Sequence, residues 1–219
     1  MVKENSPESK ILAAARSEFI EFGLRGARMQ SIADRCGVNK ALLHYYFRSK
    51  EKLYEAALQD IVQTIRSAVQ VQLDEDEADG DIRTLLRRII STYIRILQQN
   101  PDIVRFFLRE VAEGGTHLPG LITMVAPVVR DIPERIMKRF AVEIQAGSVR
   151  KQSPLHMILN LLGMCIFTFV AHPVVAEVSR QMNLGITFDD TFFDERIDMI
   201  LEMVMNGIVT DKYRRRSGA

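Results

Sequence analysis

The stretch from residue 29 to residue 53 constrains this chain more than any other, because it places a glycine turn between two short helical patterns. Gly37 stands where a glycine commonly ends a helix, and Asn39 has the side chain of an N-cap for the helix that follows. Two short helices joined by such a turn predict a helix-turn-helix, a motif that places its second helix in the DNA major groove. The predicted second helix begins at Lys40 and runs to about Tyr46.

Helical periodicity divides this second helix into an inward and an outward face. We expect Leu42 or Leu43 to face inward. Tyr46 and Phe47 are predicted to join it. The outward side chains and their neighbours can contact base edges or phosphates. The predicted DNA-contacting residues are Arg28, Gln30, Asn39, Lys40, Ala41, His44, Tyr45, Arg48 and Lys50.

Residues 8–58 resemble the DNA-binding domain of the TetR family of bacterial transcriptional regulators. The matching residues are Ile11, Ala14, Ala15, Phe19, Phe22, Gly23, Met29, Ile32, Ala33, Gly37, Val38, Leu43, Tyr46, Phe47, Lys50, Leu53 and Tyr54. The resemblance implies an all-α fold in which a three-helix helix-turn-helix DNA-binding domain is followed by a helical ligand-binding and dimerisation domain.

The chain departs from the family pattern at two places in the motif. Ala27 and Arg28 stand where the family usually has threonine or serine before the first helix of the motif, so that side-chain cap is lost. Arg28 could reach a phosphate instead. His44 stands where the family often has a tyrosine, so the phosphate contact of that tyrosine is not carried over to His44, and Tyr45 is the alternative.

The charge distribution supports a nucleic-acid-binding end. Residues 1–50 hold nine Lys or Arg against five Asp or Glu, whereas the rest of the chain holds twenty against twenty-three. A basic head on a slightly acidic body fits one end that binds DNA and one that does something else. The N-terminus lacks the apolar segment of a signal peptide, and the apolar run 155–170 is too short for a membrane span. We therefore expect a cytoplasmic protein with no membrane contact, and a buried helix over that run.

Apolar periodicity and helix-start signals predict the organisation of the whole chain. The predicted helices outside the motif cover residues 7–23, 49–71, 82–99, 101–113, 121–146, 154–171 and 191–208. We expect a DNA-binding domain over residues 1–52 and a ligand-binding and dimerisation domain over 53–211. Residues 212–219 form a basic tail that is predicted to be disordered.

The resemblance also implies a homodimer and a small-molecule effector for the body. The two last long helices would form the dimer interface, through Gly163, Phe167, Val170, Phe193, Ile197, Ile200 and Val204. The alternative is that these residues form intramolecular core. Candidates for an effector cavity are polar or soft residues on apolar faces: Tyr93, Phe106, Arg109, Met124, His156, Asn160, Met164 and Phe167. Each of them could equally be core packing, and ten methionines suit an adaptable pocket for a mostly apolar compound.

Neither a metal site, a cofactor site nor an enzyme is indicated. The four histidines show no paired metal spacing, and the nucleophile-elbow and phosphate-loop motifs are missing from the sequence. The sequence predicts a ligand-responsive regulator, more specifically a repressor that an apolar molecule releases from a palindromic operator. An activator, a helical enzyme with a helix-turn-helix-like head and a protein-interaction module are the alternatives.

Overall fold

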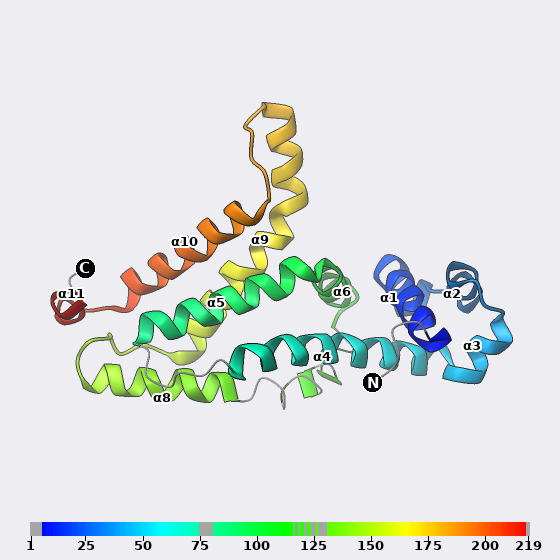
Figure 1. Cartoon of the computed structure of the whole chain (residues 1–219), viewed down its shortest axis with the longest axis horizontal. Helices are drawn as coiled ribbons and strands as arrows, with labels where there is room; N and C mark the ends of the chain where they lie inside the picture. The colour runs from blue at the N-terminus through cyan, green and yellow to red at the C-terminus, as the bar shows by residue number, and fades with distance from the viewer. Residues whose placement is uncertain are drawn as a thin grey trace. The chain divides into compact units, whose positions relative to one another are not determined.

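The computed structural model describes residues 6–74, 81–115, 117, 119–120, 122–123, 126 and 131–217. Its helices are α1 (Pro7–Gly26), α2 (Met29–Cys36), α3 (Lys40–Phe47), α4 (Lys50–Asp74), α5 (Ile82–Gln99), α6 (Pro101–Ala112), α8 (Asp131–Gln145), α9 (Pro154–Met182), α10 (Asp190–Ile208) and α11 (Asp211–Ser217) (Figure 1). The described residues contain no strand, and one isolated antiparallel bridge joins Val149 to Val209. The all-α prediction is confirmed.

The chain divides into two compact units. Unit 1 comprises residues 1–67 and 101–128, and unit 2 comprises residues 68–100 and 129–219. Helix α4 therefore begins in unit 1 and ends in unit 2, while α6 belongs to unit 1 although it follows α5 of unit 2. The predicted boundary at residue 52 followed the sequence motif alone, and the compact unit adds α6 and most of α4 to the head.

Unit 1 is built around a core that the first four helices share with α6. Phe19 of α1 meets the ring of Tyr54 of α4 edge-on, with the ring centroids 4.9 Å apart, and the ring of Phe106 of α6 lies 5.5 Å from the same Tyr54 ring. The fully buried members of this core include Ile11, Phe19, Ile32, Leu43 and Leu53. Each belongs to the periodic apolar positions that predicted the helices, so their burial fixes the arrangement of α1, α2 and α3.

Helix α1 begins where the sequence predicted but ends three residues later than predicted. Ser6 is the N-cap, its hydroxyl accepting a hydrogen bond from the Ser9 amide at 3.1 Å, and Pro7 occupies the first turn. Gly23 interrupts the helix with φ 67° and ψ 176°, and the helix resumes to Gly26. A further turn therefore follows the predicted end at Gly23.

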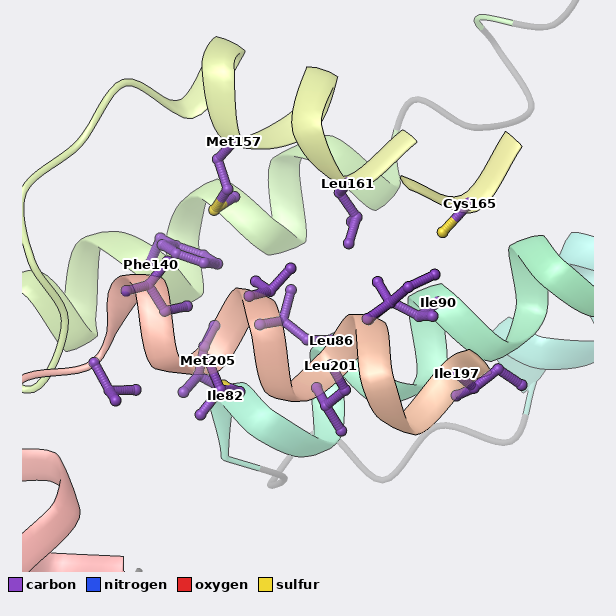
Figure 2. Packing of buried hydrophobic residues seen from close by; sticks show 14 of the residues in the cluster. Ile82, Leu86, Ile90, Phe140, Met157, Leu161, Cys165, Ile197, Leu201 and Met205 are labelled. Carbon is purple, nitrogen blue, oxygen red and sulfur yellow. The ribbon is translucent and has the colours of Figure 1, made fainter. Parts of the chain in front are cut away.

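Unit 2 is held together by one apolar core between α5, α8, α9 and α10. Figure 2 shows Leu86 and Ile90 of α5 facing Leu161 of α9 and Leu201 of α10 across this core. Its remaining buried members are Ile82, Ile94, Phe140, Val149, Met157, Cys165, Phe193, Ile197, Ile200, Val204, Met205, Ile208, Val209 and Tyr213. The apolar face of α10 is thus covered from within the same chain.

Helix α9 differs from the prediction in both length and burial. It continues through Pro173 to Met182, although His172–Pro173 was predicted to end it at about residue 171. The run that was predicted to be buried is buried only at Met157, Leu161, Cys165 and Thr168, and Leu155, Leu159 and Phe167 are each more than half accessible. By length and composition, Leu155–Met182 could also cross a membrane, a test that helices of soluble proteins pass as well.

The C-terminal tail is helical through Ser217 where the sequence predicted disorder. Its helix α11 carries Tyr213, which is buried against the core of unit 2 and whose hydroxyl donates to the carboxylate of Asp81 at 3.2 Å. The basic composition of the tail concealed this single aromatic anchor.

Candidate nucleic-acid interface

The turn between α2 and α3 has the geometry that its residues predict. Gly37 ends α2 in the left-handed region with φ 69°, and the Val38 amide donates to the Ala33 carbonyl at 3.0 Å. The side chain of Asn39 caps α3 by accepting a hydrogen bond from the Leu42 amide at 2.7 Å. This cap uses the amide oxygen of Asn39, so the NH₂ group of the same side chain is left to donate to a ligand.

Helix α3 presents a polar face to solvent. Leu43 and Phe47 face the core, while Tyr46, predicted to face inward, is 38% exposed. Two inward positions four residues apart suffice to anchor a helix of this length, which leaves Tyr46 at the edge of the buried face. The four residues predicted to point outward are exposed: Lys40, Ala41, His44 and Tyr45.

The end of α3 is closed by a cluster of three exposed side chains. Arg48 follows the helix with φ 60° and ψ −45°, and its amide donates to the His44 carbonyl at 2.9 Å. The Nδ1 atom of His44 lies 3.1 Å from the Arg48 carbonyl oxygen. The Arg48 guanidinium lies over the ring of Tyr45, 5.9 Å from its centroid. A cation and two aromatic rings are therefore held together on the face that α3 presents.

The start of α2 is capped by a residue that sequence reasoning missed. Arg28 occupies the N-cap position without a side-chain bond, as its residue type predicted, and the carboxylate of Glu18 on α1 accepts from its backbone amide at 3.3 Å. Glu18 is only 1% exposed, and it also pairs with the Nε atom of Arg35 at 2.9 Å. The signal was present in the sequence, because a glutamate beside Phe19 on the apolar face of α1 requires a partner.

Two of the predicted DNA-contacting residues also form hydrogen bonds within unit 1. The Gln30 amide donates to Asp34 at 2.8 Å on the exposed surface of α2. The Lys50 ammonium donates to the carbonyl oxygens of Arg25 and Ala27, at 3.2 Å each. These carbonyls at the end of α1 offset the unfavourable position of a lysine in the first turn of α4. One of its three N–H groups remains for a phosphate.

The predicted effector residues are not brought together in one unit. Phe106 and Arg109 lie on α6 in unit 1, where Phe106 is buried in the head core and Arg109 pairs with Glu113 at 2.9 Å. The positions in unit 2 are Tyr93 on α5 and His156, Asn160, Met164 and Phe167 on α9. Asn160, predicted to be a buried amide, is exposed, and Met124 lies outside the described residues.

Tyr93 is the partly buried member of this set on α5. It packs against the core of unit 2, where burial and the neighbouring Cys165 raise the pKa of the Tyr93 phenol to about 12. Burial likewise raises the pKa of the Cys165 thiol to about 12. Both groups are therefore neutral near pH 7, and the Tyr93 hydroxyl is a donor in an apolar setting.

The predicted dimer residues divide between the two helices. Phe193, Ile197, Ile200 and Val204 are buried within the chain, because this face of α10 packs against α5 and α9, which favours the alternative that they form intramolecular core. On α9, Phe167 is 63% exposed, Gly163 is exposed and Val170 is half-buried. The side of α10 left open instead carries Met199 and Met203.

Comparison with known proteins identifies relatives for the whole chain. Residues 11–57 match the family model described as bacterial regulatory proteins, tetR family. The HTH-type transcriptional regulator RutR of Escherichia coli O157:H7 is 25% identical over 205 residues, which is 93% of this chain and 91% of RutR. The HTH-type transcriptional repressor NicS of Pseudomonas putida is 31% identical over 108 residues, 49% of each chain.

A solved structure shows a similar fold over almost the whole chain. The ketosteroid transcriptional regulator KstR2 of Mycobacterium tuberculosis superposes with a TM-score of 0.67 at 14% identity, covering 95% of this chain and 97% of KstR2. The likeness covers both the helix-turn-helix end and the helical body.

Proposed function

This chain belongs to the TetR family of bacterial transcriptional regulators, and from this premise we propose that it is a dimeric repressor that a small molecule releases from a palindromic operator. The observation that carries the proposal is the helix α3, which is capped by Asn39 and anchored by Leu43 and Phe47. Its opposite face is exposed and polar. A helix held in this way can enter the major groove without unfolding any of the core.

The contacts with DNA divide into two kinds. Lys40, Ala41, His44 and Tyr45 lie on the exposed face of α3 and would contact base edges or nearby phosphates. Arg28, Arg48 and Lys50 are cationic residues around the motif and would hold the phosphate backbone. Asn39 and Gln30 would contribute amide donors at the starts of the two helices.

Homodimerisation is supported by the exposed apolar face of unit 2. A soluble protein seldom leaves so many large apolar side chains in water, and a second copy would cover them. The exposed members on α9 and α10 are Leu155, Leu159, Leu162, Phe167, Val174, Val178, Met182, Met199 and Met203. A two-fold dimer would present two copies of α3 to two half-sites, which is why a palindromic operator is proposed.

A ligand response is supported by the surroundings of Tyr93. A neutral phenol beside Cys165, packed against an apolar core, suits a mostly apolar molecule with one group that accepts a hydrogen bond. Such an effector would act by favouring a conformation with weaker affinity for the operator, and its effect cannot exceed its differential affinity for the two conformations. The relative NicS, which is named a repressor, supports the negative sign of regulation. The protein would act in the cytoplasm, where the chromosome is.

The test is a selection of random duplex DNA on the purified protein at near-physiological salt. We expect one palindromic motif whose half-sites lie about one helical turn apart. Placing this motif across a promoter should lower expression of a reporter in cells that produce the protein. Recovery of random sequences, with weak and salt-sensitive binding only, would contradict the proposal.

A further inference from the structure

The position of one proton in His44 follows from its hydrogen bond. The Nδ1 atom lies 3.1 Å from the carbonyl oxygen of Arg48, and a carbonyl oxygen only accepts hydrogen bonds. The proton of the neutral ring must therefore be on Nδ1, which donates it to Arg48. Nε2 is then left with a lone pair and no proton.

The end of α3 holds this arrangement in place. The Arg48 amide donates back to the His44 carbonyl at 2.9 Å, so the two residues exchange two hydrogen bonds. Arg48 has a positive φ of 60° without being glycine, a conformation that residues with a side chain seldom adopt. Backbone strain of this kind persists where the surrounding structure enforces it, and it is common at functional sites.

The free nitrogen of His44 belongs to a side chain that is exposed to solvent. His44 is exposed on the outward face of α3, and Nε2 has no hydrogen-bond partner among the described residues. Phosphate oxygens only accept hydrogen bonds, so they cannot pair with an unprotonated Nε2. In the major groove, the groups that donate are the N6 amino group of adenine and the N4 amino group of cytosine.

The neighbouring side chains offer the opposite chemistry. The amide oxygen of Asn39 is used by the helix cap, which leaves an NH₂ donor, and Lys40 is a donor only. The hydroxyl of Tyr45, 67% exposed, can donate to a phosphate and so supply the contact that tyrosine makes in the family. Donors thus gather at the start of α3, and an acceptor follows one turn later.

We propose that His44 is a specificity-determining residue that accepts a hydrogen bond from the amino group of an adenine or a cytosine in each half-site. The inference rests on the proposed function, because it needs α3 in the major groove. It assigns His44 to bases and Tyr45 to the backbone, whereas the sequence left both assignments open.

The test compares the selected motifs of the wild-type protein and His44→Ala at about pH 8.5. One adenine or cytosine position in each half-site should lose a preference of about tenfold in His44→Ala. The slope of affinity against salt should stay the same, because no phosphate contact is lost. His44→Gln should keep part of the preference, since its amide oxygen can accept from the same amino group.

A second arm removes the amino group from the DNA instead. Purine in place of the adenine, or 2-pyrimidinone in place of the cytosine, should weaken wild-type binding about tenfold and leave His44→Ala unaffected. Tyr45→Phe is the matched control and should retain the base preference. A uniform loss of affinity in His44→Ala with every base preference intact would overturn the inference. A wild-type protein that selects no motif would instead contradict the proposed function, and the inference with it.

Discussion

The phenol of Tyr54 on α4 donates a hydrogen bond to the carboxylate of Glu110 on α6, and only 2% of Glu110 is exposed. The other oxygen of this carboxylate lies 3.3 Å from both the backbone amide and Nδ1 of His117. A buried carboxylate with several donors is costly to disturb, because each lost donor leaves charge without solvation. This bond ties α6 into the same compact unit as α3.

Tyr54→Phe should lower the free energy of unfolding by about 1–3 kcal/mol, because the Glu110 carboxylate loses its phenol donor while the ring still packs. Urea denaturation followed by circular dichroism measures it. Tyr46→Phe removes a hydroxyl from a much more exposed tyrosine and should change stability little. Equal effects of the two substitutions would mean that the bond to Glu110 contributes nothing.

Gly23→Ala should destabilise the head more than Gly37→Ala does. Both glycines have positive φ, but a Cβ at Gly23 would also overlap the carboxylate of Glu113, whereas a Cβ at Gly37 would meet nothing within 4 Å. The φ of Gly37 costs an alanine about 1–2 kcal/mol, and Gly23 has in addition a ψ that is almost restricted to glycine. Adding Glu113→Ala to Gly23→Ala should recover only the steric part. Thermal unfolding of the three variants would show whether this order holds.

Lys50→Ala should weaken binding to all DNA sequences alike and reduce the slope of log affinity against log salt by about one unit. The variant should also unfold more easily, because the carbonyls of Arg25 and Ala27 lose their ammonium donor. Binding titrations at several salt concentrations test the first effect. An unchanged slope would leave Lys50 with a structural role only.

Phe167→Glu should affect dimerisation, whereas Phe193→Ala should affect the stability of the fold. Phe167 is 63% exposed on α9, so a charge there should dissociate the dimer while the helical content stays the same. Phe193 is 6% exposed in the core of unit 2, so its truncation should cost about 3–5 kcal/mol of stability. Sedimentation and denaturation separate the two effects. A Phe167→Glu protein that stays dimeric would place the interface elsewhere.

Asp81→Asn should reduce the loss of stability in acid. Burial would raise the pKa of Asp81, but hydrogen bonds from the backbone amide and hydroxyl of Thr84 and from Tyr213, with the charge of Arg139, lower it below its usual value. Because the pKa of Asp81 is lower in the folded state than in the unfolded state, its ionised carboxylate stabilises the folded protein at pH values above the unfolded-state pKa, near 4. This stabilisation is lost as the pH falls through the folded-state pKa. The free energy of unfolding, measured between about pH 6 and pH 2, should therefore fall less steeply for Asp81→Asn than for the wild-type protein. Parallel curves for the two proteins would contradict this assignment.

Sequence reasoning succeeded where the signal is local. The caps at Ser6 and Asn39 and the turn at Gly37 depend on neighbours within a few residues, and all three are confirmed. Helix α5 also has the predicted bounds, because Asp81 caps it and Asn100–Pro101 ends it.

Sequence reasoning failed where the outcome depends on distant partners. The apolar face of α10 could have met a second subunit or α5, and periodicity alone does not distinguish them. The same holds for Glu18 and Glu110, whose burial depends on Arg35 and Tyr54 in other helices. Pro173 does not end the helix that it was predicted to end, because α9 continues through it for nine residues to Met182.

The most direct test of the central claim is the equilibrium affinity of the protein for its selected operator and for a scrambled duplex of the same composition, at about 0.15 M salt. A dimeric regulator that contacts bases through α3 should bind the operator at least about a thousandfold more tightly, with two chains on each duplex. Equal affinity for the two duplexes, or one chain on each, would contradict it.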